Sequence, residues 1–285
     1  SGGQRPAVRV QLNPAALAAY GLALVWGVTS VKNLAQGDFV MMGGYLGYEL
    51  SRHGVHPIAA ILPVAVLMFG YGWLIYKLII RRVIQLDLFT SLLATFGLAI
   101  TMQQVMNLVF GPDVRTLKSG FGRFEMFGGM VDITQIRVIA FALCAVLAVA
   151  MVLFLRKSRM GQAIRATAQD YEAAYAMGVN VDRIYMVAFA MGSMLGGIAG
   201  VLVGVYYNLF YPTMGGLYGL KAFSAAILGG VGNIPGAILG GLLLGVAESL
   251  GAAYISSGFK DAIAFAILIL VLLLRPQGIL RGRGD

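Results

Sequence analysis

The chain has 285 residues, of which 59% are hydrophobic and only 12% are charged, and its mean hydropathy is +0.83. Soluble domains carry about 25% charged residues, so this composition excludes an ordinary soluble protein and indicates a membrane protein. The net charge of +9 does not indicate nucleic-acid binding, because the basic residues lie between apolar runs. A single cysteine, Cys144, excludes a disulfide framework and a cysteine metal cluster.

Eight apolar runs come close to the length of about 20 residues that crosses the hydrocarbon core of a bilayer. In chain order they are 14–31, 34–50, 57–80, 88–110, 134–155, 184–206, 234–255 and 260–275. No polar interval between them is long enough to fold a second domain. We therefore expect an all-α, polytopic membrane protein with about eight transmembrane segments. A polar leader (1–13) precedes the membrane domain (14–280), and a basic tail (281–285) follows it.

The arrangement of lysine and arginine predicts the orientation, because cytoplasmic loops carry an excess of both residues. Alternation places Arg81, Arg82 and the polar loop 156–183 inside, and the loop 111–133 outside. The basic tail should also lie inside, but one crossing between 206 and 260 would leave it outside. We therefore expect 220–255 to enter and leave on the outer side, as a half-helix, a glycine break and a return helix. The alternative is one long bent span with the basic tail outside.

The glycine break in this segment is a candidate for the solute pathway. Non-helical backbone at membrane depth is tolerated only where protein or a water-filled cavity surrounds it. The candidate residues of the break are Gly229, Gly230, Gly232, Asn233 and Pro235.

Polar residues also occur where the first span ends. Asp38 can interact favourably with the positive N-terminal end of the second span, and Asn33 or Gln36 can close the turn before it. Contact with a solute is the second interpretation, and the two do not exclude each other. Asn33, Gln36 and Asp38 are therefore pathway candidates.

Polar side chains inside later spans need protein or water around them. In the fourth span, uncharged polar residues could line a passage for a zwitterionic solute or form hydrogen bonds between helices. We favour hydrogen bonds for most of them and keep Gln103 and Gln104 as pathway candidates. For Glu248, a conformational hinge, a pairing partner and a pathway role all remain open. The sixth span has a helix-packing ridge at i, i+4 spacing, formed by Gly192, Gly196, Gly200 and Gly204.

The polar loop 156–183 predicts a docking site for a partner. Its alanine-rich sequence favours a helix over 162–177, ended by Gly178. Arg165, Gln169 and Glu172 would share one face of that helix. A short solvated connector is the alternative interpretation. The docking candidates are Arg159, Gly161, Arg165, Asp170, Glu172, Ala173, Ala174 and Gly178.

Two motifs resemble those of known transporters. Glu172-Ala173-Ala174, followed after three residues by Gly178, resembles the loop by which permeases of ABC importers grip their ATPase subunits. Residues 33–38 resemble the N-F-A-H-G-[DE] signature of branched-chain amino acid ABC permeases, with Leu34 in place of Phe and Gln36 in place of His. The segments 219–237, 245–248 and 275–280 also match that family. The resemblance covers about residues 20–280, while the family's customary lead-in to the first helix is scarcely visible upstream of Pro14.

The resemblance implies a permease subunit of an ABC importer for branched-chain or related apolar amino acids in a bacterial-type cytoplasmic membrane. It would pair with a homologous permease or with itself, with two ATPase subunits inside and a soluble binding protein outside. No P-loop motif and no catalytic or metal-ligand constellation is visible, so we expect no enzyme activity and no cofactor or metal. The alternatives are a permease for urea, short amides or another amino acid class, a self-sufficient channel or secondary carrier, and a membrane scaffold.

Overall fold

The computed structural model describes residues 15–29, 33–84, 86–116, 123–126, 131–230, 234–254, 259–275 and 278. The first helices are α1 (Ala15–Thr29), α2 (Gln36–Arg52) and α3 (Ile61–Ile75), which continues through a π-helical turn, η1 (Tyr76–Ile80), into α4 (Arg81–Val83). They are followed by α5 (Leu88–Phe110), α6 (Gln135–Lys157), α7 (Arg159–Gln169), α8 (Tyr171–Ala176), α9 (Val181–Tyr207), α10 (Met214–Gly229), α11 (Ile234–Tyr254) and α12 (Lys260–Leu274). The predicted leader and basic tail lie outside the described residues.

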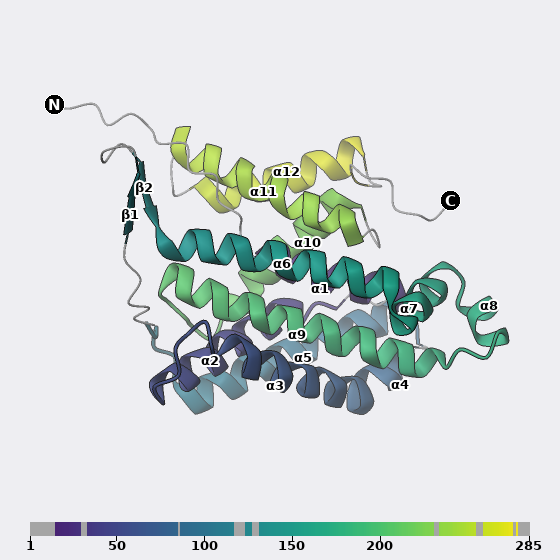
Figure 1. The fold of residues 1–285 in the computed structure, drawn as a ribbon. Helices are drawn as coiled ribbons and strands as arrows, with labels where there is room; N and C mark the ends of the chain where they lie inside the picture. The colour runs from purple at the N-terminus through teal and green to yellow at the C-terminus, as the bar shows by residue number, and fades with distance from the viewer. Residues whose placement is uncertain are drawn as a thin grey trace.

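The all-α, polytopic fold is confirmed, because every one of the eight predicted apolar runs coincides with a helix (Figure 1). Four helical segments in the described part are long and apolar enough to cross a membrane: Ile61–Val83, Phe89–Phe110, Val138–Lys157 and Val181–Tyr207. The apolar helices Gly236–Gly251 and Asp261–Leu274 are shorter. One short antiparallel hairpin, β1 (Arg123–Met126) with β2 (Val131–Thr134), was not predicted and lies in the loop between α5 and α6.

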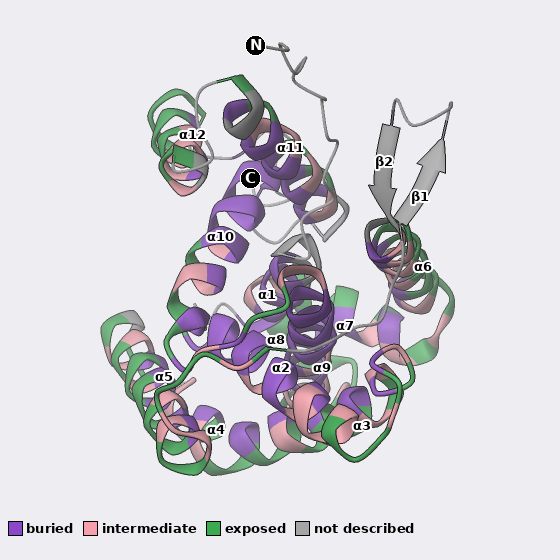
Figure 2. Cartoon of the chain, turned by 90° about the vertical axis from the view of Figure 1, so that its left-hand side faces the viewer, coloured by how far each residue is buried: buried purple, intermediate pink, exposed green. Residues whose placement is uncertain are grey.

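Helix α9 is the centre of the packing, and it contacts α1, α2 and α3 (Figure 2). Its ridge glycines lie where neighbouring backbones come close. Gly192 lies against Gly21 of α1, and a Cβ at Gly200 would meet the Val40 carbonyl oxygen and the Gly44 nitrogen of α2. At such contacts only a residue without a side chain allows the two helices to approach so closely.

Helices α10 and α11 fold back on each other as an antiparallel hairpin. Gly229 lies against Gly236 at the turn, and Gly240 lies against Ala225 further along. The order of half-helix, glycine break and return helix therefore matches the prediction, but the half-helix is longer than predicted because it begins at Met214 instead of residue 220. The chain reverses direction at the break, so α10 and α11 are not one long bent helix.

The prediction of one helix over 162–177 is wrong, because the chain forms two helices that meet at Asp170. The backbone of Asp170 is extended (φ −157°, ψ 107°), and its carboxylate accepts a hydrogen bond from the Ala173 nitrogen at 2.9 Å. This side chain caps α8, so it favours a new helix start over continuation of α7. Arg165 and Glu172 therefore do not lie on one helical face.

Candidate functional site

Three of the predicted pathway residues meet where the backbone leaves α1 and enters α2. The Gln36 amide nitrogen donates a hydrogen bond to the Gly192 carbonyl oxygen of α9 at 3.1 Å. Asn33 donates to the Gln36 side-chain oxygen at 3.4 Å and accepts from the Ala35 nitrogen at 3.1 Å. Both side chains are buried, so these bonds satisfy polar groups that would otherwise be costly in the interior.

Asp38 joins this group from the first turn of α2, where the partial positive charge of the helix end favours a carboxylate. It is only 2% exposed, and the Gln103 amide of α5 donates a hydrogen bond to it at 2.9 Å. Gly215 of α10 packs directly against its carboxylate. The structure thus brings Asn33, Gln36, Asp38 and Gln103 together in a set that we name the α2 cluster. Gln104 does not belong to it, because its side chain is exposed.

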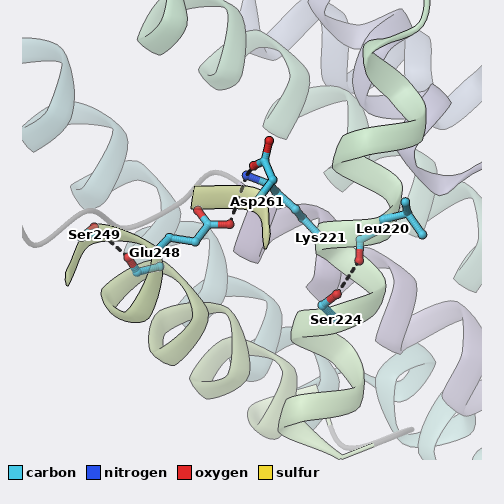
Figure 3. Close-up of polar contacts among 7 residues, drawn as sticks. Leu220, Lys221, Ser224, Glu248, Ser249 and Asp261 are labelled. Carbon is cyan, nitrogen blue, oxygen red and sulfur yellow. Dashed lines mark hydrogen bonds and ion pairs between the residues drawn. The ribbon is translucent and has the colours of Figure 1, made fainter. Parts of the chain in front are cut away.

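A second buried polar group joins α10, α11 and α12 (Figure 3). The Lys221 ammonium lies 3.1 Å from the Glu248 carboxylate and 2.6 Å from the Asp261 carboxylate. The Lys221 and Glu248 side chains are 5% and 1% exposed, whereas that of Asp261 is 46% exposed. Of the three roles considered for Glu248, the structure shows pairing. We call these three residues the ion triad.

Lys221 and Asp261 were not predicted as site residues. The available signal was a lysine inside the apolar piece 220–230, which needs an opposite charge if it is buried. Glu248 was the only acid inside the neighbouring apolar run 234–255, so the pair could have been proposed from charge alone.

The glycine break is described only in part. Gly229 is in contact with Gly236, and Gly230 (φ +102°) lies against Gly278, which follows α12. Gly232 and Asn233 lie outside the described residues. Pro235 is in the first turn of α11, and its side chain is not described.

The predicted docking residues lie at the end of the molecule opposite the β-hairpin (Figure 1). Ser158 caps α7 by accepting from the Gly161 nitrogen at 2.9 Å, and Gly161 is buried against Phe154 and Leu155 of α6. Ala174 is also buried and anchors α8. The other docking candidates are exposed: Arg159, Arg165, Asp170, Glu172, Ala173 and Gly178.

Large side chains that were not predicted as docking residues dominate the exposed surface of α8 and of the residue that follows it. Tyr171, Tyr175 and Met177 are 55%, 73% and 85% exposed. The Tyr171 hydroxyl donates a hydrogen bond to Glu172 at 2.9 Å. This bond, and to a smaller extent the negative charge of Glu172, raises the pKa of Tyr171. Gly178 has φ +83°, a conformation that glycine adopts without strain, and it turns the chain towards α9.

Helix α8, the first turns of α9, and η1 with α4 line a cavity of about 1310 Å³. Arg81, Asp182 and Tyr76 line it. The Arg81 guanidinium lies 3.2 Å from the Asp182 carboxylate, and the Tyr76 hydroxyl donates to the same carboxylate at 3.0 Å. These contacts fix the first turn of α9 to η1 and α4.

Comparisons with known proteins give a consistent assignment. The family model described as branched-chain amino acid transport system / permease component matches residues 7–272. The chain is 36% identical over 280 residues to the high-affinity branched-chain amino acid transport system permease protein LivH of Escherichia coli K12, covering 93% of this chain and 90% of LivH. It is 35% identical to BraD of Pseudomonas aeruginosa, a protein of the same description, over 93% of this chain and 91% of BraD.

A more distant relative is the ribose import permease protein RbsC of Haemophilus influenzae, with 26% identity over 91% of this chain and 80% of RbsC. No solved structure matches the chain significantly. The relatives are transport permease components and not enzymes, and the apolar helices show a multi-pass membrane protein. Because the family model and the bacterial relatives both match along nearly its whole length, the chain belongs to the family of branched-chain amino acid transport system permease components.

Proposed function

We propose that the chain is one half of the translocation pathway of an ABC importer for branched-chain or related apolar amino acids. It pairs with a homologous permease or with a second copy of itself in a bacterial-type cytoplasmic membrane. Two separate ATPase subunits drive it from the inside, and a soluble binding protein delivers the solute outside. The observation that carries this proposal is α8, a short exposed helix with apolar and aromatic side chains that is firmly connected to the core.

The connection between α8 and the core supplies a mechanical path. Gly178 leads from α8 into α9, whose first turn is tied to η1 and α4 through Asp182. Helix α9 is continuous over 27 residues, and its Gly192 carbonyl accepts the hydrogen bond from Gln36. A displacement of α8 by a closing pair of ATPases would therefore move α9 and change the environment of the α2 cluster.

The α2 cluster is the best candidate for the solute pathway in this proposal. It combines a carboxylate with several amides at the point where α2 begins, and the α2 backbone there is covered by Gly215 and Gly219 of α10. Small movements of α10 at these glycine contacts would expose Asp38. An amino acid presents an ammonium group that a carboxylate recognises.

The test is uptake of radiolabelled leucine by proteoliposomes that contain the chain with the subunits that co-purify with it in mild detergent. We expect uptake only when ATP and the binding protein are both present. Uptake by the chain alone, driven by an ion gradient, would show a secondary carrier instead. Efficient uptake of urea or short amides with no uptake of leucine would replace the proposed substrate class.

A further inference from the structure

Three polar atoms at the outer end of the α2–α5 seam are buried without a hydrogen-bond partner. They are the Tyr45 hydroxyl, the Asn107 side-chain oxygen and the Arg115 Nε. Tyr45 is 0% exposed and lies on α2, Asn107 lies in the last turns of α5, and Arg115 follows α5. Buried polar groups in folded proteins are nearly always paired, so these three orphan atoms need an explanation.

All three residues are positioned around Phe110. The Tyr45 and Phe110 rings lie 4.7 Å apart between centroids, and Arg115 donates from Nη2 to the Phe110 carbonyl oxygen at 2.7 Å. The backbone carbonyl of Asn107 accepts from the Gly111 nitrogen at 2.9 Å, which fixes the same turn.

Arg115 itself is held in place by backbone as well as by side chain. Its nitrogen and carbonyl oxygen both pair with Phe210, each at 2.8 Å, which joins the loop after α5 to the loop before α10. Among the side chains that the structure describes, which do not include those of the hairpin 123–134, no ion pair involves Arg115. The Nε–H of this half-buried arginine is therefore an unused donor.

The unused groups match the charges of an α-amino acid. The Arg115 Nε–H and the Tyr45 O–H are donors, which a carboxylate accepts, and Arg115 adds the positive charge. The Asn107 oxygen is an acceptor, which an ammonium group satisfies. Urea and short amides carry no carboxylate, so they offer Arg115 no negative charge. Two donors beside one acceptor thus select a zwitterion.

These residues also lie along the same seam as the α2 cluster. Gln103, which binds Asp38, is one helical turn before Asn107 on α5, and Tyr45 is about two turns after Asp38 on α2. A solute held at Arg115 would therefore have only to move along the seam between α2 and α5 to reach Asp38.

We propose that Arg115, Tyr45 and Asn107 form an entrance site that recognises the zwitterionic head of the amino acid before it reaches Asp38. The proposal rests on the proposed transport function and deepens it, because it names the chemistry by which the permease itself selects amino acids. The site is closed in this structure, and opening of the seam exposes its orphan groups to the solute.

The experiment measures equilibrium binding of radiolabelled leucine to the purified transporter complex in lipid nanodiscs, without binding protein or nucleotide. Tyr45→Phe removes one hydroxyl and keeps the ring that packs on Phe110, so it should fold and weaken binding about five-fold. Tyr48→Phe, on the same helix, is the matched control and should bind as the wild type does. Arg115→Gln should weaken binding about 30-fold, because it removes a charged hydrogen bond. Arg52→Gln, at the exposed outer end of α2, should have no effect.

Competition completes the test. Leucinamide lacks the carboxylate and 4-methylpentanoate lacks the ammonium, and each should displace leucine at least about ten-fold less well than unlabelled leucine. Wild-type affinity in both Tyr45→Phe and Arg115→Gln, or equal competition by leucinamide, overturns the entrance site. So does the absence of any leucine binding. ATP-dependent leucine uptake by the same preparation separates the entrance site from the proposed function. If uptake occurs but the binding results overturn the entrance site, the transport function stands. If no uptake occurs, the transport function is rejected.

Discussion

A single buried residue, Lys221, shows how a charge inside an apolar bundle constrains its neighbours. Taking charges out of water costs several kcal/mol for each ion, so a buried lysine is retained only when partners surround it. The two carboxylates of the ion triad come from different helices. One ammonium group therefore fixes the positions of α10, α11 and α12 relative to one another.

Replacement of Lys221 by methionine should destabilise the protein by about 3–5 kcal/mol, because it leaves the buried Glu248 charge uncompensated. The measurement is thermal unfolding in detergent, monitored as the loss of the monodisperse peak in size-exclusion chromatography. Arg52→Met is the control, since the Arg52–Glu49 pair is exposed and 3.7 Å long, and it should cost at most about 1 kcal/mol. A double variant, Lys221→Met with Glu248→Leu, should recover much of the lost stability. Equal losses for Lys221→Met and Arg52→Met would contradict the role of the ion triad.

Asp170 explains why one local prediction failed. The helix propensity of the residues around it favours an uninterrupted helix, and a sum of propensities treats aspartate as only mildly unfavourable. Its short carboxylate instead bonds the Ala173 nitrogen, and this competing interaction starts a second helix. Propensity predicts that a segment is helical, whereas the site of a break depends on one side-chain contact.

At the scale of helices, the glycines of α9 set how closely α2 can approach. A Cβ at Gly200 would meet backbone atoms of Val40 and Gly44, which cannot move aside as a flexible side chain could. Gly200→Ala should therefore destabilise the protein by about 1–3 kcal/mol through overpacking. Gly216→Ala is the control, because Gly216 is an exposed helical glycine of α10 with open space around it. The same thermal assay checks both, and an unchanged Gly200→Ala midpoint would show that α2 and α9 are not packed backbone to backbone.

The turn after α8 should be required for coupling between ATP hydrolysis and transport. Gly178 and Gly54 both have positive φ, +83° and +88°, and at both positions the space that a Cβ would occupy is open, with no neighbouring atom within 4 Å. Substitution by leucine should strain each turn similarly, by about 1–3 kcal/mol. Of these two variants, only Gly178→Leu should lower the amount of leucine imported per ATP hydrolysed. Gly54 lies in the turn between α2 and α3, away from the proposed docking helix α8. Glu172→Lys should also uncouple, through reversal of the exposed charge on α8.

Measurement of ATP hydrolysis and uptake in the same proteoliposomes distinguishes coupling from folding. Normal coupling in both Gly178→Leu and Glu172→Lys would reject α8 as the docking helix. Equal loss in Gly178→Leu and Gly54→Leu would attribute the effect to backbone strain alone.

For the molecule as a whole, length and hydropathy predicted the apolar helices well, because a helix that crosses the bilayer needs a long run of apolar side chains. The contacts between helices could not be predicted in the same way. Gln103 was selected only as one polar residue among several, and its bond to Asp38 depends on how α5 packs against α2. Gln104, adjacent in sequence, faces outwards. The β-hairpin was missed because its strands have only four residues each, which is too short for a clear alternating pattern.

The orientation of the whole chain in the membrane can be tested by cysteine labelling. Asp113, Met177 and Tyr254 have exposed side chains. In a Cys144→Ser background, each is replaced singly by cysteine, and intact cells are treated with a membrane-impermeant maleimide. The positive charge at Arg81, Arg82, Arg156 and Lys157 predicts that α8 lies inside, so Met177→Cys should react only after permeabilisation. Asp113→Cys should react from outside.

Because α10 and α11 form an antiparallel hairpin, Tyr254→Cys should react from outside as well. Helix α12 would then carry Arg275 to the inner side. Reaction of Met177→Cys in intact cells would reject docking of the ATPases on α8. Protection of Tyr254→Cys in intact cells would instead mean that α10 and α11 do not enter and leave on one side.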